Sequence, residues 1–379
     1  GGTFGGPIKK DKLFFFGAYE GQRYSVGNPT LLSYPSLDPK AMPFAGNTPV
    51  TTSVIQACLN VPAASRSVTS LKMAGLDATC TRTSGYSIFD LGSSFARLRD
   101  SNGALGGNVS GNLNTDYAVN GYMGKADYNL NDKNTINAKY FLGNHTGLVV
   151  NSATITQPYW RPTDTANVQF FGAQWNYIAS SSMFNTVRVG YNRFYQKFET
   201  SDCPGAGTAP DYGIPFGYGT TKPNCGFTNI TLSPFTGAIG CCSSFPKYYG
   251  PDNILEFHDG FSYLRGKHNF KVGGEFRNSE AGDGGVYNRG RGQVTFSTLE
   301  TFFSGTPSGN GQIFIGDPLR DMKQKAMAAY FQDDWRILPR LMLNLGIRYE
   351  YETPLTEGNN MMSNFIPGTG FTQLGVNTN

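Results

Sequence analysis

Residues 341–352 alternate between apolar and polar side chains without interruption. One side of this segment carries Leu341, Leu343, Leu345, Ile347, Tyr349 and Tyr351. The other side carries Met342, Asn344, Gly346, Arg348, Glu350 and Glu352. A repeat of two residues is the side-chain period of a β-strand, so one face of this strand must be covered by apolar material while the other meets water. A soluble β-sandwich meets this requirement, and so does a membrane β-barrel with lipid outside and a polar lumen inside.

The composition favours an all-β chain. Its 379 residues include 48 Gly and 14% aromatic residues, but only 15% charged residues. This balance is typical of strands, turns and interfaces rather than of salt-bridged helices. No run approaches the ~18 consecutive apolar residues of a membrane helix. The net charge of +4 is too small to indicate a nucleic-acid partner.

Tight polar turns alternate with long connections along the chain. The tight turns are predicted at 9–12, 131–134, 179–182, 266–268 and 338–340, and the long connections at 26–116, 146–164, 199–252 and 280–320. Each tight turn joins two strand-like runs, so all the long connections fall at one end. Outer-membrane barrels have this asymmetry, with short periplasmic turns and long outer loops.

The predicted fold is an all-β, transmembrane, antiparallel up-and-down β-barrel, here an incomplete barrel of ten long strands with long extracellular loops. The strands are predicted at 1–8, 13–25, 117–130, 135–145, 165–178, 183–198, 253–265, 269–279, 321–337 and 341–352. Most of them reach the ~9–11 residues that a tilted strand needs to cross a bilayer. A short strand at 293–296 and a helical turn at 298–303 are expected in an outer loop.

Alternation also assigns side chains to the two faces. The residues predicted to face lipid are Tyr140, Val189, Tyr191, Phe270, Val272, Leu343, Leu345, Ile347 and Tyr349. The charged residues predicted to face the lumen are Lys139, Arg188, Lys271, Glu275, Arg277, Arg348 and Glu350. Aromatic residues near strand ends, namely Tyr128, Trp175, Tyr177, Tyr263 and Trp335, suit a girdle at the water boundary. Asp259 interrupts the apolar face of its strand.

All six cysteines lie in the long connections, and their even number suits disulfides in an oxidising compartment. Cys58 and Cys80 are the natural local pair. Cys203 pairs with Cys225, or either of them pairs with one of the adjacent Cys241 and Cys242. A metal site is the weaker interpretation, because no Cys-x-x-Cys occurs and the three histidines are scattered.

Five segments resemble one family. Residues 4–23, which read Phe-Gly-Gly-Pro-Ile-Lys-Lys-Asp-Lys-Leu-Phe-Phe-Phe-Gly-Ala-Tyr-Glu-Gly-Gln-Arg, are similar to the early barrel region of Oar-like TonB-dependent outer-membrane receptors. Segments 125–134, 188–194, 266–277 and 330–336 are similar to later barrel strands of the same family. The resemblance implies a barrel of about twenty-two strands closed by a plug. We therefore expect residues 1–379 to be part of such a barrel, without its plug, its N-terminal domain and its C-terminal strands.

The resemblance implies a function as well. An outer loop would capture an unidentified solute, and a TonB-type energising complex, acting through segments outside this chain, would drive its uptake across the bacterial outer membrane. Outer-membrane lipid would be the other partner. The alternatives are a barrel that displays its loops for adhesion without transport, and a secreted β-sandwich that binds carbohydrate.

Motifs for catalysis are missing from the sequence. It contains no His-Glu-x-x-His, no Gly-x-Ser-x-Gly and no phosphate-binding Gly-x-x-x-x-Gly-Lys-Ser/Thr. Glu280 and Asp283 lack the ordered ligand spacing of a calcium loop. We expect no enzymatic activity, no metal and no cofactor.

Overall fold

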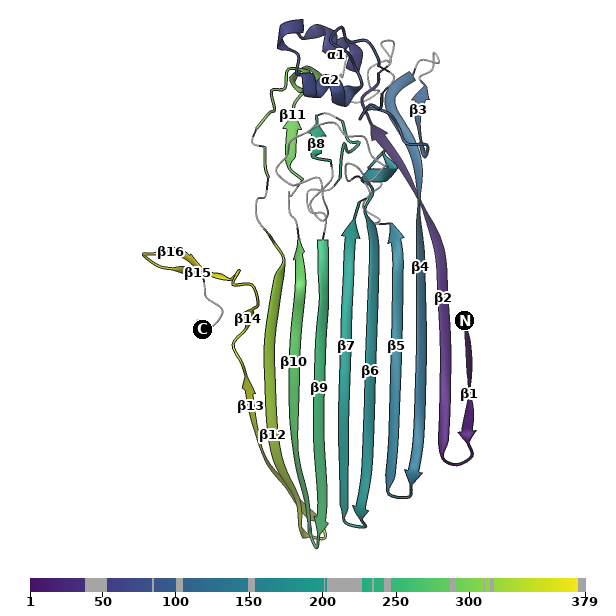
Figure 1. Cartoon of the computed structure of the whole chain (residues 1–379), viewed down its shortest axis with the longest axis vertical. Helices are drawn as coiled ribbons and strands as arrows, with labels where there is room; N and C mark the ends of the chain where they lie inside the picture. Colours follow the sequence, from purple (N-terminus) through teal and green to yellow (C-terminus); the bar gives the residue numbers. More distant parts are fainter. Residues whose placement is uncertain are drawn as a thin grey trace.

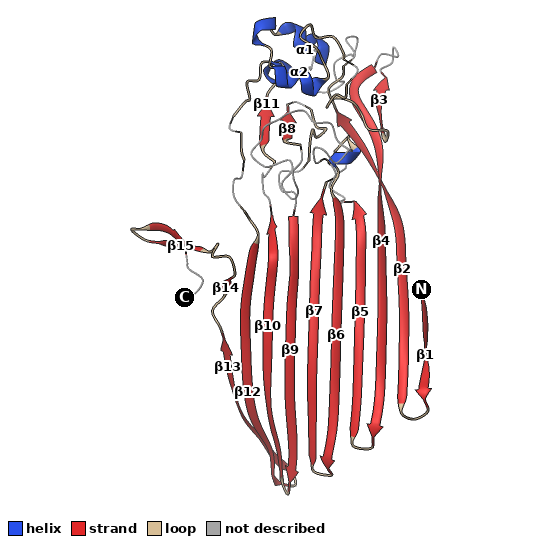
Figure 2. Ribbon diagram, in the orientation of Figure 1, coloured by secondary structure: helices blue, strands red, loops and turns tan. Residues whose placement is uncertain are grey.

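The structure is a computed structural model that describes residues 1–37, 53–83, 85–99, 105–148, 154–200, 202, 227–233, 235–241, 247–286, 291–309, 311–313 and 317–373. Long strands form one continuous sheet, with a smaller folded region above one end (Figures 1 and 2). In order, they are β1 (Gly2–Lys9), β2 (Leu13–Ser33), β4 (Leu105–Asn131), β5 (Asn134–Leu148), β6 (Thr163–Ser180), β7 (Met183–Glu199), β9 (Lys247–Arg265), β10 (His268–Val286), β12 (Arg320–Leu338) and β13 (Leu341–Glu352). Short β3 (Phe95–Arg99) pairs with β4, and β14 (Thr356–Glu357) pairs with β12.

The sheet is an antiparallel meander. Each long strand pairs antiparallel with the next one in the chain, so the order in the sheet follows the order in the sequence. The tight turns at 10–12, 132–133, 181–182, 266–267 and 339–340 all lie at one end, and the long connections lie at the other (Figure 1). The predicted up-and-down all-β fold is confirmed.

The predicted strand limits are correct near the tight turns and too short at the other end. Residues 26–33 and 105–116, predicted as loop, belong to β2 and β4. The ladder between these strands runs without a register shift from Leu13↔Tyr128 to Ser33↔Asn108. Backbone N–H and C=O groups need partners whatever side chains they carry, so the ladder continues through polar and Gly-rich sequence. For the same reason β10 continues through Gly282–Gly285, which the composition presents as loop.

The long connections fold together into one unit, here called the cap, which comprises the described residues of 32–37, 53–98, 154–162, 227–241 and 291–313. It contains the helices α1 (Val54–Asn60), η1 (Ala63–Ser65), α2 (Val68–Ala74), η3 (Pro158–Trp160) and α3 (Leu299–Phe303). Strands β8 (Asn229–Leu232) and β11 (Gln293–Phe296) pair in parallel within it. The expected strand at 293–296 and helical turn at 298–303 are therefore confirmed as β11 and α3.

Local capping explains where the cap helices begin and end. The Ser53 side chain accepts from Gln56 N at the start of α1, and Ser67 accepts from Ser70 N at the start of α2. These hydroxyls satisfy backbone donors that have no partner within a helix. Helix α2 ends at Gly75, whose φ of 68° is a left-handed conformation that glycine adopts without strain.

The cap contains the hydrophobic core of the described chain. Trp160 is 1% exposed and stacks on Phe227, with ring centroids 5.3 Å apart. Phe302 is fully buried and contacts the rings of Phe89 and Phe296 at 5.6 and 5.4 Å. The upper ends of β2 and β4 contribute Leu32, Val109 and Leu113 to the same core. Segments distant in sequence are thus joined by one apolar interior, as in a small domain.

The two outer strands of the sheet each have an open edge. Among the described residues, β1 pairs only with β2, and β13 pairs only with β12. The sheet is curved but does not close into a barrel. A hairpin of β15 (Ser363–Ile366) and β16 (Gly370–Gln373) projects away from it near the C-terminus (Figure 1). Within the described segments, no helix is both long and apolar enough to cross a membrane.

Candidate functional site

A hollow of about 930 Å³ lies on one face of the sheet. Residues of eight strands, from Lys125 on β4 to Glu352 on β13, line this single space. A hollow bounded by strands so far apart requires the sheet to curve around it, so this face is concave. It is called the inner face below, and the opposite face is called the outer face.

The structure places the seven charged residues predicted for the lumen on the inner face. Six of them line the hollow: Lys139, Arg188, Glu275, Arg277, Arg348 and Glu350. Lys271 lies on the same face of β10 as Glu275 and Arg277, and it is four residues closer to the tight turn than Glu275. Its Nζ is 2.9 Å from Asp334 Oδ2. Alternation along each strand therefore brings together charges that are more than 200 residues apart in sequence.

Arg348 is the centre of the ionic network in the hollow. Its Nη2 donates to Glu275 Oε2 at 2.8 Å, and its Nε donates to Glu350 on the same strand. His258 Nε2 lies 3.6 Å from Glu275 Oε1, which extends the network to β9. The Arg348 and Glu275 side chains are each 41% exposed, so water screens the pair and it contributes little to stability. The ion pairs give this part of the inner face a hydrated surface that carries both positive and negative charges.

Two cations in the hollow have neutral partners. Arg188 Nε donates to Gln174 Oε1 at 3.0 Å, and Lys139 Nζ lies 5.1 Å from the centre of the Phe170 ring. Within the described part of the chain, neither cation lies within 4.0 Å of a carboxylate. The β5–β7 part of the wall is therefore more positive than the β10–β13 part.

Above these charges, the inner face becomes aromatic. Tyr24 of β2 stacks on Tyr117 of β4, and Tyr117 contacts the His145 ring of β5 at a centroid distance of 5.3 Å. Gln196 Nε2 donates to Asp164 Oδ1 at 2.9 Å, and His145 Nε2 lies 3.2 Å from Asp164 Oδ2. This cluster was not predicted from the sequence. Its members on β4 and β5 lie an even number of residues from Lys125 and Lys139, so the same alternation also assigns them to the inner face.

The outer face is apolar and uncovered. The structure places all nine residues predicted to face lipid on it. Ile347 and Tyr349 are 72% and 70% exposed, and Tyr140 is 43% exposed. Among the described residues, no second layer packs on this face, whereas a β-sandwich covers the apolar face of one sheet with another. An apolar surface of this extent requires an apolar covering from outside the chain.

Aromatic residues mark two levels of the outer face. Near the tight turns lie Tyr128, Trp175, Tyr177, Tyr263 and Trp335, the residues that suit a girdle. Higher up, three tyrosine hydroxyls donate to an amide oxygen of the next strand. The pairs are Tyr19 to Asn120 at 3.1 Å, Tyr140 to Gln169 at 3.3 Å and Tyr191 to Asn253 at 3.0 Å. Rings with an apolar body and a satisfied polar tip are typical of a membrane–water boundary.

Asp259 lies on the outer face between these two levels. It pairs with Val187 and Gly274, and Phe257 and Phe261 flank it along β9. Among the described residues, its Oδ1 has no hydrogen-bond partner and is shielded from water.

Replacing Asp259 by valine is expected to raise the free energy of unfolding by about 1 kcal/mol, because a carboxylate in the lipid-facing band is destabilising. Urea titration of the protein in lipid vesicles measures the change. Glu256→Val, on the inner face of the same strand, is the control and is expected to give no gain. A loss of stability in Asp259→Val would contradict the assignment of this face to lipid.

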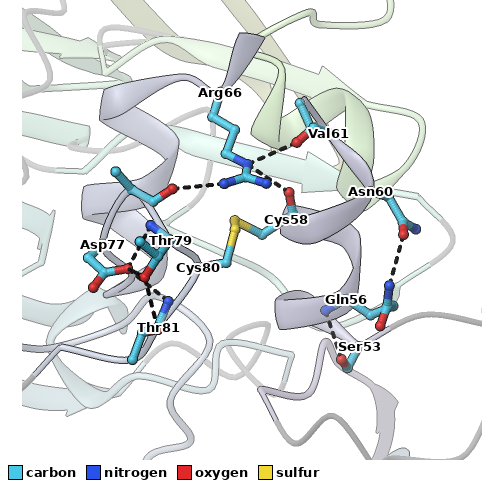
Figure 3. The surroundings of a disulfide bond; sticks show 11 residues. Ser53, Gln56, Cys58, Asn60, Val61, Arg66, Asp77, Thr79, Cys80 and Thr81 are labelled. Carbon is cyan, nitrogen blue, oxygen red and sulfur yellow. Dashed lines mark hydrogen bonds between the residues drawn. A yellow bond between two sulfur atoms is a disulfide. The ribbon is translucent and has the colours of Figure 1, made fainter. Parts of the chain in front are cut away.

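A disulfide joins Cys58 of α1 to Cys80, which follows α2 (Figure 3). The Arg66 guanidinium links the end of α1 to the segment that precedes Cys80. Its Nε donates to the carbonyls of Cys58 and Val61 at 3.0 and 2.9 Å, and its Nη1 donates to Ala78 O at 2.8 Å. Cys241 is also disulfide-bonded. The predictions for Cys203, Cys225 and Cys242 lie outside the described residues.

The Asp77 carboxylate organises the turn that precedes Cys80 (Figure 3). It accepts from the Thr79 hydroxyl at 2.7 Å and from the backbone N–H groups of Thr81 and Thr79 at 2.9 and 2.8 Å. These hydrogen bonds, that of the Thr79 hydroxyl first, hold the pKa of the Asp77 carboxyl below its ordinary value of 3.8. A lowered pKa in the folded state means that the carboxylate stabilises the turn above pH 3.8 and that this stabilisation is lost as the pH falls through the lowered pKa.

Acidification is therefore expected to release the amides of Thr79 and Thr81 before the rest of the cap. Hydrogen exchange at these two amides, corrected for the intrinsic effect of pH, should rise as the pH falls below about 4. In Asp77→Asn, the corrected exchange should not depend on pH in this range. An unchanged corrected rate in the parent protein down to pH 2 would contradict the prediction.

A buried ion pair supports the cap at the top of the sheet. Arg291 Nη1 lies 3.1 Å from Asp202 Oδ1, and the two side chains are 4% and 0% exposed. Asp202 Oδ2 also accepts from Phe227 N at 2.9 Å, which satisfies a backbone donor beside the Trp160–Phe227 stack. Within the described segments, no group of three or more His, Cys, Asp or Glu side chains is placed to hold a metal ion.

Comparison with known proteins relates the chain to one family and to solved structures. The family described as "Outer membrane beta barrel domain" matches residues 1–378. The crystal structure of the siderophore receptor PirA from Acinetobacter baumannii superposes with a TM-score of 0.40 and 12% sequence identity. That match covers 95% of this chain and 38% of the receptor, so the chain spans well under half of that protein's length. No curated protein matches the sequence.

Proposed function

This chain belongs to the outer membrane β-barrel domain family of the bacterial outer membrane, and on that premise we propose that it builds part of the wall of a TonB-dependent receptor. The receptor takes up a solute from outside the cell. The observation that carries the proposal is the arrangement of three surfaces around one sheet. An apolar outer face meets lipid, a hollow of mixed charge lies on the inner face, and a folded cap lies above the end opposite the tight turns.

These surfaces suggest a sequence of events. The cap meets the external medium and selects the solute, because binding residues lie disproportionately on long loops that a rigid scaffold positions. The hydrated inner wall then offers the solute a polar path past the hydrocarbon. Energy relayed by TonB from the inner membrane moves a plug, which belongs to a segment outside this chain, and the solute is released inward. No covalent chemistry is needed in this scheme.

The resemblance of five segments to Oar-like receptors supports a finer assignment to that group. These segments lie on β1–β2, at the β4–β5 turn, on β7, at the β9–β10 turn and on β12, so they are spread across the whole sheet. They concentrate at the end with the tight turns, whereas the cap carries the part of the chain with no such similarity. This distribution is expected if members of the group share the barrel strands and differ in the cap that selects the solute.

Residues 1–379 are then one portion of the barrel domain. The edges of β1 and β13 expose backbone N–H and C=O groups that cannot stay unpaired in hydrocarbon. Further strands of the same receptor therefore pair with both edges and complete the barrel.

Solute depletion by living cells tests the proposal. Cells with and without the full-length receptor are grown in a complex medium, with and without a protonophore that abolishes the energy source of TonB. Mass spectrometry of the medium should show at least one solute that disappears only when receptor and energy are both present. Identical depletion profiles in all four cultures would contradict uptake. They would favour the display of the cap for adhesion, which its self-contained core also permits.

A further inference from the structure

The aromatic cluster on the inner face spans strands β2, β4 and β5, which continuous backbone ladders already join. Tyr24 and Tyr117 are stacked, with ring centroids 4.9 Å apart and an interplanar angle of 21°. The Tyr24 side chain is nevertheless 47% exposed, so a large part of its surface meets water inside the curved sheet. A half-exposed ring that is stacked on a second ring of a concave wall offers a platform on which another ring can pack.

The register fixes the platform on the inner face. Tyr117 is eight residues from Lys125 on β4, and no register shift separates them in the ladders with β2 and β5. An even spacing keeps two side chains on the same face, and Lys125 lines the hollow. The Tyr117 ring lies over Gly147 of β5, where an added Cβ would come within 2.2 Å of Tyr117 Cδ1. Gly147 therefore allows the ring to lie flat on the wall.

Hydrogen-bonding groups border the platform. Asp164 on β6 is held by Gln196 Nε2 at 2.9 Å, while His145 Nε2 lies 3.2 Å from its other oxygen. A carboxylate offers about four lone-pair positions, so Asp164 can accept further hydrogen bonds from a ligand. Hydroxyl groups at the edge of a bound ring would reach this acceptor, whereas a purely apolar ligand would leave it unused.

The charge of this part of the wall disfavours anions. On the described inner faces of β2, β4, β5 and β6, no Lys or Arg lies above Lys125 and Lys139. The charged groups there are the carboxylates Glu20 and Asp164, with His145 beside the latter. Phosphate or carboxylate ligands would meet like charge without a guanidinium or ammonium partner.

We propose that Tyr24, Tyr117 and His145, together with Asp164 and Gln196, form a subsite for a neutral carbohydrate. The C–H face of a sugar ring packs on the tyrosines, and the sugar hydroxyls donate to Asp164 and accept from the Gln196 amide. The subsite rests on the proposed receptor function and names the solute class for it. It lies between the cap and the charged hollow, so it would receive the sugar before the sugar passes the lower wall.

Binding of neutral glycans to the full-length receptor in detergent tests the subsite. The probes are oligosaccharides of glucose, mannose, galactose and xylose, titrated by calorimetry. At least one is expected to bind, and Tyr24→Ala is expected to weaken it about tenfold through loss of the stacking face. The same backbone with uronic-acid units is expected to bind more weakly than its neutral form, because Asp164 and Glu20 repel it.

The chain offers a matched control on the same two strands. Tyr19 of β2 and Tyr122 of β4 also form a ring pair, at 5.0 Å, but they lie on the outer face. Tyr19→Ala should leave glycan affinity unchanged while it removes an equivalent tyrosine. Resistance of the folded protein to unfolding in cold sodium dodecyl sulfate verifies that both variants fold. Equal weakening by both variants, or no binding of any neutral glycan to the parent protein, would overturn the subsite.

Cell uptake separates the failure of the subsite from the failure of the receptor function. A glycan that binds through Tyr24 but is not depleted by energised cells would retain the subsite and refute uptake. Energy-dependent depletion of some other solute, with the same rate in Tyr24→Ala cells, would retain uptake and refute the subsite.

Discussion

Replacing Ala173 by arginine is expected to lower the free energy of unfolding by about 2–4 kcal/mol, the cost of a cation at the bilayer midplane. Ala173 lies on the outer face of β6, paired with Ala138 and Val189. It is four residues from Tyr177 near the tight turn and four residues from Gln169, so it lies midway across the apolar band. Denaturant titration of the full-length protein in phosphatidylcholine vesicles measures the loss.

The matched control is the same change on the inner face, Ala328→Arg. Ala328 lines the hollow and pairs with Glu275 on one side and Glu350 on the other. An arginine there enters water beside two carboxylates, and its effect should stay below about 1 kcal/mol. Similar losses in the two variants would mean that lipid does not cover the outer face, and the membrane interpretation would be abandoned.

Truncating Phe302 to alanine is expected to destabilise the cap by about 3–5 kcal/mol, the usual cost of removing a buried aromatic ring. Phe302 is fully buried and contacts the rings of Phe89, Phe296 and Phe303. Hydrogen exchange followed by mass spectrometry should show faster exchange in all the cap segments together. The strands below should keep their protection, because their ladders do not depend on this core.

Val68→Ala is the control for the cap. Val68 begins α2 but is 81% exposed, so its truncation removes little buried surface and should change exchange by less than twofold. If Phe302→Ala accelerated exchange only in residues 299–303, the cap segments would be independent loops rather than one folded unit.

The long strands could be predicted because their two faces differ in solvent. Along β13, every outer side chain is apolar and most inner ones are polar, which leaves one register and one orientation. Tight turns such as Asn131–Asn134 then fixed which end carries the short connections. Neither inference needs tertiary contacts, since period and turn chemistry are local properties.

The upper parts of β2 and β4 could not be predicted in this way. Gly27, Asn28 and Pro29 on β2 lie opposite Asn112, Leu113 and Asn114 on β4. By composition, both stretches are turn-like. They are strands because each completes the backbone ladder of the other and because the cap core holds their ends together.

The hydrophobic core of the cap could not be predicted from the sequence for a related reason. Its members are scattered from Leu32 to Phe303 over several short segments, and the pattern within each segment is too short to identify the segment that covers it. Trp160 and the Phe302–Phe303 pair, large apolar residues within polar loops, were the available signal. Such residues indicate burial but do not identify the segment that covers them.

The inner face was partly predictable. Alternation placed Lys139, Arg188 and Arg348 together on one side, but it could not match them with partners. The pairing of Arg348 with Glu275 spans 73 residues and depends on the β10–β12–β13 register. The ring cluster could not be predicted for the same reason, because Tyr24 and His145 lie on two strands that are separated by β4.

The shared interior of the cap also has consequences for how the cell surface is recognised. Because distant connections are fixed against one another by Trp160, Phe302 and the residues around them, the outermost surface is a composite epitope. Antibodies or bacteriophages that bind it would depend on the folded conformation, and linear peptides copied from one connection would make poor immunogens. Antigenic drift would in turn be constrained, since a substitution in one connection must remain compatible with the others.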